Sequence, residues 1–391
     1  MRFFCPCPRG LESVLAHELR ALGAHEIDET GGGVGFGGTI TLAYRANLHS
    51  RIASRVLLEI ARRPYRREAD LYALTHEQRW ENHFSASQTL RVDTTAIRSP
   101  LKSLNFANLR VKDGIVDRMR ERTGSRPSID TDAPDVRVFS FLTGREATLY
   151  LDLSGEPLFK RGWRAGRERK GEAPIKENLA AGLLALARWQ PGTPLRDLFC
   201  GAGTIPIEAA QIAAGRAPGL DRRFAIERLA LHRAAQAQRV EDDARETLEA
   251  ARADLPARLD AAPISGIDID PDAIAMSIAN LDRAGLPPWA VRFEVGDARE
   301  APPPAHAGGT AGLELSNPPY GERVEIDTAT WRAVGANLRT HYREWRACFI
   351  TADRGLPGQL GLRERRKTPL FNGAIECRLF EFELFPPKPA G

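Results

Sequence analysis

The residues with the clearest chemical potential are Asn317, Pro318, Pro319 and Tyr320, which follow a short apolar run. Two consecutive prolines fix their own φ angles and remove two backbone N–H donors. The carbonyls of Asn317 and Pro318 and the Asn317 side-chain oxygen can then point at one small group, with Tyr320 adding an aromatic face. Such acceptors suit a planar group with two N–H donors, such as the exocyclic amine of a nucleobase. The alternative interpretation is a proline-rich turn after a strand.

A glycine turn lies about 120 residues upstream. Asp197 belongs to a short apolar run, and Cys200, Gly201, Gly203 and Thr204 lead from it into a segment with helical spacing. A strand that turns through glycines into a helix brings backbone N–H groups and the positive helix end close to a ligand. Many glycine turns bind nothing, so this motif alone is weak.

Two further acidic residues follow predicted strands. Asp268 ends the apolar segment 264–268, and Asp297 follows the alternating segment 291–295. A carboxylate at such a strand end can accept hydrogen bonds from both hydroxyls of a ribose. For each aspartate alone, a helix cap or a turn residue is the favoured interpretation. Together with Asp197 and Asn317 they give four polar strand ends in sequence, which predicts an open α/β sheet with a ligand at its carboxyl edge.

The remaining elements are predicted from periodicity. In the front half we expect the order strand, helix, strand, strand, helix up to residue 65, with helices at 11–22 and 48–60. The glycine-rich stretch 31–38 is interpreted as a hairpin tip, because no helix or Lys-Ser/Thr pair follows it. Further elements are expected at 89–93 (strand), 105–122 (helix), 136–142 and 147–153 (strands), 174–187 (helix), 215–262 (helical insertion), 347–351 (strand), and 363–370 with 375–384 (closing hairpin).

The order of these motifs resembles the class I S-adenosylmethionine (SAM)-dependent methyltransferases that modify exocyclic amines. The strings at 158–164, 173–181 and 317–323 narrow the resemblance to bacterial RNA guanine-N2 methyltransferases that bear a THUMP domain, with the family acting on 23S ribosomal RNA as the most similar type. The likeness spans nearly the whole chain, including 107–115 and 372–378. One departure is 197–204, which reads Asp-Leu-Phe-Cys-Gly-Ala-Gly-Thr where many members have Asp-Pro-Met-Cys-Gly-Ser-Gly-Thr. The former spelling also occurs in 5-methyluridine RNA methyltransferases, which weakens this loop as evidence for guanine.

The resemblance implies an α/β protein with three domains. These are an N-terminal ferredoxin-like domain at 1–65, a THUMP RNA-binding domain at 66–155, and a Rossmann-like class I methyltransferase domain at 156–391 with a mostly parallel seven-stranded sheet. Its implied cofactor is SAM, and its implied partner is RNA, with ribosomal RNA favoured.

The resemblance also implies roles for individual residues. Asp268 would hold the ribose, Asp297 the adenine amine, and Gly201 and Gly203 would allow close approach at the methionine end. Asp197 would contact the methionine ammonium or order the loop. The full cofactor-binding prediction is Asp197, Cys200, Gly201, Gly203, Thr204, Asp268, Ile269, Asp297, Ala298 and Glu177. Asn317, Pro318, Pro319 and Tyr320 are the predicted catalytic residues, and Lys112, Arg161 and Arg323 are the predicted RNA contacts.

Other functions stay open on these residues. A carbon-5 pyrimidine methyltransferase would need a cysteine nucleophile, but Cys348 and Cys377 lack a nearby motif and Cys200 lies in the cofactor loop. Adenine N6 in DNA and guanine in transfer RNA use the same chemistry, and the tetrapeptide does not separate them. The THUMP-like front half favours RNA. A non-catalytic RNA-binding assembly factor is disfavoured by the intact acidic strand ends.

Composition sets the remaining limits. A chain of 391 residues suits two or three domains. Five scattered cysteines do not form a disulfide framework, and Cys5 and Cys7 lack the partners of a metal site. No apolar run of about 18 residues and no signal-peptide core are present, so a cytoplasmic protein without a membrane or metal partner is expected. The oligomeric state stays open.

Charge is unevenly distributed along the chain. Residues 1–170 carry 28 Lys and Arg against 21 Asp and Glu, whereas residues 171–391 carry 27 against 30. A basic front half joined to a near-neutral back half suits a polyanion that one part holds and the other modifies. Arginine clusters such as 62–67 are more often a solvated surface, so the asymmetry only supports the motif argument.

Overall fold

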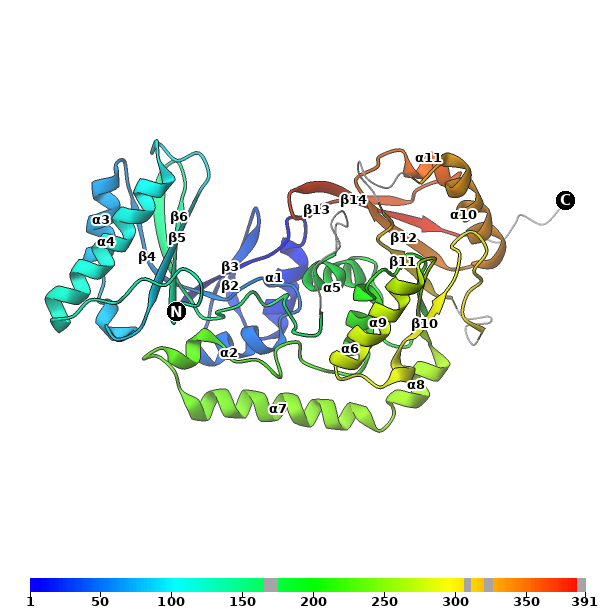
Figure 1. Ribbon diagram of the computed structural model, residues 1–391, viewed down its shortest axis with the longest axis horizontal. Helices are drawn as coiled ribbons and strands as arrows, with labels where there is room; N and C mark the ends of the chain where they lie inside the picture. Colours follow the sequence, from blue (N-terminus) through cyan, green and yellow to red (C-terminus); the bar gives the residue numbers. More distant parts are fainter. Residues whose placement is uncertain (165–174, 306–310, 320–325, 385–391) are drawn as a thin grey trace.

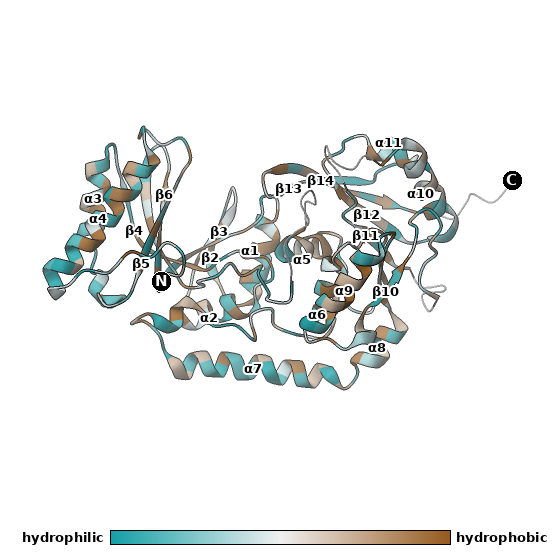
Figure 2. Ribbon diagram, in the orientation of Figure 1, coloured by the Kyte–Doolittle hydropathy of each residue, from teal (hydrophilic) through white to brown (hydrophobic). Residues whose placement is uncertain are grey.

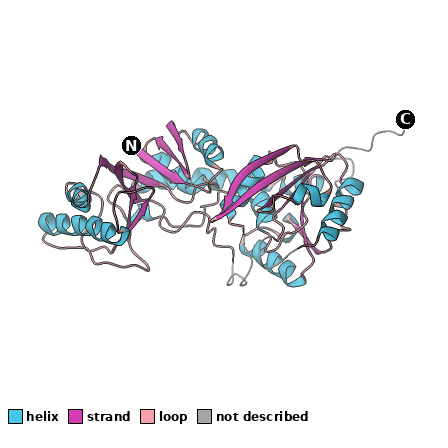
Figure 3. Cartoon of the chain, turned by 90° about the horizontal axis from the view of Figure 1, so that it is seen from above, coloured by secondary structure: helices cyan, strands magenta, loops and turns pink. Residues whose placement is uncertain are grey.

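The computed structural model describes residues 1–164, 175–305, 311–319 and 326–384. The molecule is elongated (Figure 1), and its strands gather in two separate groups (Figure 3). Each group is a seven-stranded sheet. None of the helices in this part of the chain is both long and apolar enough to cross a membrane.

The first sheet has the strand order β2-β3-β1-β4-β7-β6-β5. Its strands are β1 (Arg2–Pro6), β2 (His25–Thr30), β3 (Gly33–Gly37), β4 (Leu57–Pro64), β5 (Leu90–Ala96), β6 (Val136–Leu142) and β7 (Glu146–Asp152). β5 and β6 are parallel, and the other neighbours are antiparallel. β4 pairs with both β1 and β7, so strands from the segments 1–65 and 66–155 share one sheet.

Helices accompany the first sheet along the chain. They are α1 (Glu12–Ala21), α2 (Ile40–His49), α3 (Glu68–His76), the short 3-10 helix η1 (Trp80–Asn82) and α4 (Leu104–Thr123). In α4, Val111, Ile115 and Met119 are fully buried and Val116 is partly buried, so these residues form the inner side of the helix. The hairpin predicted at the glycine-rich stretch 31–38 is confirmed, although its turn is limited to residues 31–32, because β3 occupies 33–37 and pairs with β2.

The helix predicted at 48–60 is wrong. α2 begins eight residues earlier, where Thr39 Oγ1 accepts a hydrogen bond from the Leu42 N–H, and it ends at His49. The apolar run that follows is strand β4. A short apolar run fits a buried strand as well as a helix, and here the pairing with β1 and β7 decides between them.

The second sheet has the strand order β10-β9-β8-β11-β12-β14-β13. Its strands are β8 (Leu195–Asp197), β9 (Ile264–Asp268), β10 (Arg292–Val295), β11 (Leu313–Ser316), β12 (Arg346–Thr351), β13 (Arg366–Asn372) and β14 (Ile375–Glu383). The strands from β10 to β12 in this order are parallel, while β14 and β13 are antiparallel to their neighbours. The predicted Rossmann-like, mostly parallel seven-stranded sheet is therefore confirmed.

Helices lie on both faces of this sheet, as a buried parallel sheet requires. The helices of this half of the chain are α5 (Glu177–Leu186), α6 (Thr204–Ala213), α7 (Ala234–Arg252), α8 (Leu255–Ala261), α9 (Pro271–Arg283), α10 (Thr328–His341) and α11 (Leu356–Leu360), with 3-10 helices η2 (Ala225–Arg228) and η3 (Pro288–Ala290). Of these, α7 and η2 pack toward the first sheet's part of the chain. On one side, Trp331 and Leu338 of α10 pack in a cluster with Phe349 of β12. The other face shares a larger core with α5, α6 and the first sheet.

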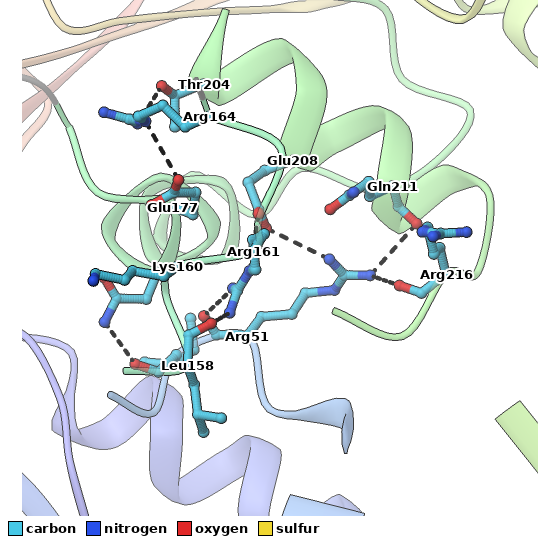
Figure 4. A network of polar contacts seen from close by, with 12 residues as sticks. Arg51, Leu158, Lys160, Arg161, Arg164, Glu177, Thr204, Glu208, Gln211 and Arg216 are labelled. Atoms are coloured by element: carbon cyan, nitrogen blue, oxygen red, sulfur yellow. Dashed lines mark hydrogen bonds and ion pairs between the residues drawn. The ribbon is translucent and has the colours of Figure 1, made fainter. Parts of the chain in front are cut away.

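Besides this shared core, polar contacts join the part of the chain that forms the first sheet to the part that forms the second, and two of them are described here. The largely hydrophilic α7 (Figure 2) packs against α2, where Tyr44 Oη accepts a hydrogen bond from the Arg233 N–H at 2.7 Å. The second contact is an ion-pair cluster (Figure 4). Glu208 of α6 is fully buried, with its Oε2 atom 3.5 Å from Arg51 Nη1 and its Oε1 atom 3.2 Å from Arg161 Nε. This cluster ties α6 to the loop after α2.

Candidate active site

Four neighbouring strands bring the predicted polar residues to one edge of the second sheet. Asp268 ends β9, Asp197 ends β8, Asp297 lies two residues after β10, and Asn317 directly follows β11. The chain proceeds from β8 to β9 on one side and later returns to β11 on the other. The gap between β8 and β11 is therefore a topological switch point, the place where open α/β sheets bind ligands.

The glycine turn after β8 contains two left-handed glycines with different surroundings. Gly201 has a φ of 50° and Gly203 a φ of 78°. A Cβ atom at Gly201 would meet nothing within 4 Å, whereas one at Gly203 would lie 2.8 Å from Phe293 Cζ and 3.1 Å from Ser277 Cβ. Gly201 thus borders open space where a ligand can approach the backbone, and Gly203 allows α6 to pack closely.

Helix α9 holds the glycine turn through two buried side chains. Ser277 Oγ donates to the Gly201 carbonyl at 2.6 Å, and Asn280 Nδ2 donates to the Ala202 carbonyl at 2.9 Å. Sequence reasoning missed both residues. Their signal was two polar side chains three positions apart on the otherwise apolar side of a helix.

The carboxylate of Asp268 accepts two backbone hydrogen bonds. Its Oδ2 atom accepts from the Gly201 N–H and its Oδ1 atom from the Asp270 N–H, both at 3.0 Å. The adjacent Ile269 side chain is 68% exposed, which is unusual for isoleucine. A hydrogen-bond acceptor beside an open apolar face suits a nucleoside, whose sugar is polar and whose base is flat.

Asp197 is buried, and its Oδ1 atom accepts hydrogen bonds from the Phe199 N–H at 3.0 Å and from Ser316 Oγ at 2.8 Å. Burial raises the pKa of Asp197 from 3.8 to about 7. Ser316 is the last residue of β11, so this contact ties the carboxyl ends of β8 and β11 together. Sequence reasoning missed Ser316, because a single serine at a strand end carries no pattern.

The cysteines do not offer a nucleophile. Cys200 is buried, and its backbone N–H donates to the Ile267 carbonyl at 2.9 Å. Cys348 and Cys377 are fully buried on β12 and β14. Burial raises the pKa values of the Cys200 and Cys348 thiols well above their usual range, whereas a nucleophilic cysteine needs a lowered one.

Asn317 carries an unsatisfied acceptor. Its Oδ1 atom is buried and has no hydrogen-bond partner among the described residues. The following Pro318 is buried and Pro319 is exposed. Tyr320 and Arg323 lie outside the described residues. Because buried polar atoms are nearly always paired, an orphaned oxygen at the switch point indicates a ligand donor.

Asp297 is engaged by a neighbouring arginine. The Arg299 Nε atom lies 3.0 and 2.9 Å from the two carboxylate oxygens. The Arg299 guanidinium holds the pKa of Asp297 below its usual range. The carbonyl of Ala298 accepts from Asn337 Nδ2 of α10 at 2.9 Å, which fixes the backbone beside Asp297.

Glu177 and Thr204 are brought together by Arg164 (Figure 4). Arg164 Nη2 donates to Thr204 Oγ1 at 2.8 Å, and Arg164 Nε lies 3.3 Å from Glu177 Oε1. Burial raises the pKa of Glu177, and the Arg164 charge opposes that shift. Arg164 therefore links the start of α5, at Glu177, to the start of α6, at Thr204. Sequence reasoning had assigned no role to Arg164.

Two of the predicted RNA contacts, Lys112 and Arg161, lie away from this edge, and the third, Arg323, lies outside the described residues. Arg161 is corrected: its side chain is only 2% exposed, and its Nη2 atom donates to the Arg51 carbonyl at 2.8 Å, so it joins the buried Glu208 cluster instead of reaching RNA. Lys112 lies on α4 at the opposite end of the molecule (Figure 1), with its Nζ atom 3.1 Å from Asp113. Within the described ranges, no group of three or more His, Cys, Asp or Glu could hold a metal ion.

This sheet order and switch-point site define a class I methyltransferase domain. Residues 164–381 match the family model described as RMKL-like, methyltransferase domain. Residues 2–57 match an RlmL ferredoxin-like domain, and residues 65–152 match a THUMP domain. The chain belongs to the RMKL-like methyltransferase family.

Known proteins resemble the chain over most of its length. It is 42% identical over 392 residues to a ribosomal RNA large subunit methyltransferase K/L from Syntrophotalea carbinolica, covering 98% of this chain and 54% of the relative. The chain thus spans about half the length of the curated relatives it matches.

Solved structures also cover nearly the whole chain. One, of a protein described as a methyltransferase and solved with S-adenosylhomocysteine (SAH), is 27% identical with a TM-score of 0.86 over 100% of this chain and 99% of the other. A predicted N6-adenine-specific DNA methylase from Listeria monocytogenes is 28% identical with a TM-score of 0.83, over 99% and 96% of the two chains.

Proposed function

We propose that this chain binds SAM at the carboxyl ends of β8, β9 and β10 and methylates the exocyclic N2 amine of a guanine in 23S ribosomal RNA. The proposal that an amine is methylated rests on the Asn317 Oδ1 atom, which is buried beside the β8–β11 gap and has no hydrogen-bond partner among the described residues. Ribosomal RNA is supported by the similarity to large-subunit rRNA methyltransferases over 98% of the chain. The cofactor is supported by the structural neighbour solved with SAH.

The residues present fit an adenosyl cofactor. The Asp268 carboxylate would accept from the ribose hydroxyls, and the exposed Ile269 side chain would cover one face of the adenine. Open space at Gly201 leaves room for the methionine end. Asp197 would attract the methionine ammonium, and Asp297 would accept from the adenine amine after releasing Arg299.

Methyl transfer needs positioning more than acid–base catalysis. Bound SAM supplies a methyl group on a sulfonium, and in-line displacement needs the accepting nitrogen about 3 Å away. The guanine N2 lone pair is delocalised into the ring, so the amine is a weak nucleophile. Asn317 Oδ1 and the Pro318 carbonyl would accept its two hydrogens and favour electron density on nitrogen. An extruded base would stack on Tyr320, which lies outside the described residues.

The front half would hold the RNA. We assign residues 1–65 and 66–155 to the ferredoxin-like and THUMP domains and 156–391 to the methyltransferase domain, and propose Lys112 and Arg323 as RNA contacts. This division is supported by the basic surplus of residues 1–170 and by the THUMP match. The protein would act in the cytoplasm, where ribosomal RNA is made in bacteria.

Incubation of the purified chain with SAM and separate samples of ribosomal RNA, transfer RNA and DNA, followed by nucleoside mass spectrometry, tests this function. We expect N2-methylguanosine in 23S RNA alone. Asn317→Ala should lower methyl transfer at least about 100-fold, as loss of an oriented catalytic contact does, while the affinity for SAH stays within about twofold. Asp282→Asn, on the exposed side of α9, is the matched control.

Other products would identify the competing functions. N6-methyladenosine in DNA would favour the activity ascribed to the Listeria neighbour. Methylated guanine in transfer RNA alone would change the substrate but keep the chemistry. SAH binding without any methyl acceptor would indicate an RNA-binding assembly factor.

A further inference from the structure

A chain of three buried polar side chains lies directly beneath the proposed methyl-transfer site. Glu314 and Ser316 lie on β11, and Asp197 ends β8; the structure buries all three almost completely. Ser316 Oγ contacts Asp197 Oδ1 at 2.8 Å, makes a short contact with Glu314 Oε1, and accepts the Leu198 N–H at 2.8 Å. The mechanism above uses Asp197 but assigns no role to Glu314 or Ser316.

The hydrogen atoms available to these three hydrogen-bonded side chains can be counted. A serine hydroxyl has one hydrogen to donate and two lone pairs to accept with. The Leu198 N–H occupies one lone pair, and two carboxyl oxygens compete for the single hydrogen. If both carboxyls were ionised, one oxygen would face the serine oxygen without a proton between them. One carboxyl must therefore be a neutral acid that donates to Ser316 Oγ.

The surroundings identify Glu314 as that acid. Backbone N–H groups favour the ionised form of both carboxyls, from Phe199 to Asp197 Oδ1 at 3.0 Å and from Leu198 and Cys348 to Glu314. Glu314 differs in that its Oε2 atom is buried with no hydrogen-bond partner among the described residues. Glu314 is fully buried in the middle of a parallel sheet, where its charged form is costly. Burial, with the nearby charge of Asp197, raises the pKa of Glu314 well above its usual range.

We propose that Glu314 is a positioning residue that donates, as a neutral acid, to Ser316 Oγ and thereby directs the Ser316 hydroxyl hydrogen onto Asp197. The Asp197 charge is then left free to attract a cationic group of the cofactor. Asn317 is the next residue after Ser316, so the same contact sets the distance between the amine-binding oxygen and the cofactor-binding strand end. This role rests on the proposed function, because it presumes that Asp197 binds cofactor and Asn317 binds the amine.

Three variants separate this role from simple packing. Glu314→Gln keeps a neutral hydrogen-bond donor of nearly the same shape, and Glu314→Leu keeps the volume without a donor. Ser316→Ala removes the hydroxyl that connects Glu314 to Asp197. We expect Glu314→Gln to keep SAH affinity and kcat within about threefold. Because Ser316→Ala removes the hydrogen bond that orients the charged Asp197 carboxylate, it should weaken SAH binding about tenfold or more. Glu314→Leu should lower both SAH affinity and kcat about tenfold.

The measurements are SAH titration calorimetry, thermal unfolding and infrared spectroscopy of each variant of the 391-residue chain. A buried acid predicts a protonated-carboxyl C=O band that Glu314→Gln removes, which a packing role would not produce. The proposal is overturned if the band is absent, if folded Glu314→Gln binds SAH as weakly as Ser316→Ala, or if Ser316→Ala binds SAH like the wild type. If Glu314→Leu fails to fold, the SAH affinities of Glu314→Gln and Ser316→Ala still test the proposal. The SAH titration, unfolding and infrared measurements need no RNA, and kcat is measured separately with 23S RNA. Loss of RNA methylation with the expected SAH and infrared results would therefore count against the proposed function alone.

Discussion

Asp268 Oδ2 accepts a hydrogen bond from the Gly201 backbone N–H at 3.0 Å, so the end of β9 holds the glycine turn that follows β8. The two residues are 67 positions apart in the chain. One carboxylate therefore orders the turn and remains available at its outer side for a ribose. The binding surface is already formed by the protein's own contacts, which reduces the entropy lost when a ligand binds.

Asp268→Asn should weaken SAH binding about 10- to 100-fold. The amide keeps the shape but loses the charge, and a hydrogen bond to a charged group contributes about 1.5–3 kcal/mol where a neutral one contributes about 0.5–1.5 kcal/mol. Calorimetric titration with SAH measures the effect. Asp282→Asn, an exposed site on α9, is the control and should bind normally. Equal affinities in the two variants would remove Asp268 from the cofactor site.

Alanine at the two glycines of the turn should have different effects. Gly203→Ala would place Cβ 2.8 Å from Phe293 Cζ, so we expect about 3 kcal/mol of lost unfolding free energy from overpacking and the left-handed backbone. Gly201→Ala has no such clash and should cost about 1–2 kcal/mol, yet its Cβ would occupy the open space and weaken SAH binding. Urea unfolding and SAH titration together measure both effects. Equal losses of stability would contradict the assigned packing role of Gly203.

SAH affinity should rise with pH through about 7, because Asp197 must be ionised to attract an ammonium group and burial raises its pKa to about 7. Asp197→Asn should bind weakly and with little dependence on pH. Titrations between about pH 5.5 and 8.5 test this. A wild-type affinity that is flat across that range would mean that Asp197 does not meet the cofactor's charge.

Ionisation of Asp197 is expected to favour SAH binding but to lower the stability of the folded protein. The pKa of Asp197 is higher in the folded protein than its ordinary 3.8. Its contribution to stability is therefore fully present below about pH 4 and is lost as the pH rises to about 7. Compared with Asp197→Asn, the wild type should lose unfolding free energy across that window.

The polar residues at the strand ends could be predicted from the sequence, but the side-chain contacts that hold these strand ends together could not. Asp197, Asp268 and Asn317 follow apolar runs, so their meeting at one edge follows from the parallel sheet alone. Ser316 and Glu314 could not be assigned, because the pairing of β8 with β11 joins residues about 120 positions apart. A single glutamate in a strand carries no periodic signal.

Long-range ion pairs and sheet pairing explain the remaining errors. Arg161 looked like a surface arginine because Glu208, its buried partner, lies 47 positions away. The segment after residue 48 looked helical because β4 obtains its identity from pairing with β1 and β7. In both cases tertiary structure overrides the local pattern.

Arg299→Ala should tighten SAH binding about two- to fivefold. Arg299 occupies both oxygens of Asp297, the residue proposed to accept from the adenine amine. Its removal abolishes that competition, and the gain is small because Arg299 is half exposed to solvent, which screens such a pair. Calorimetry at low and moderate salt checks the change. Weaker binding would indicate that Arg299 itself contacts the cofactor.

Glu208→Gln should lower the free energy of unfolding by about 3–5 kcal/mol, because it removes the buried carboxylate that contacts both the Arg51 and the Arg161 guanidinium. Glu227→Gln is the matched control, since its partner Arg223 is largely exposed and the pair should contribute little.

The position of Glu208 also predicts a functional effect. It lies on α6, four residues after Thr204, and connects the start of that helix to the loop after α2. Loss of this connection should loosen the glycine turn as well as the junction between the two sheets, so SAH binding should weaken in parallel. Urea unfolding with SAH titration of both variants measures this coupling. Lower stability with unchanged SAH affinity would show that the cluster only holds the two parts together and does not support the turn.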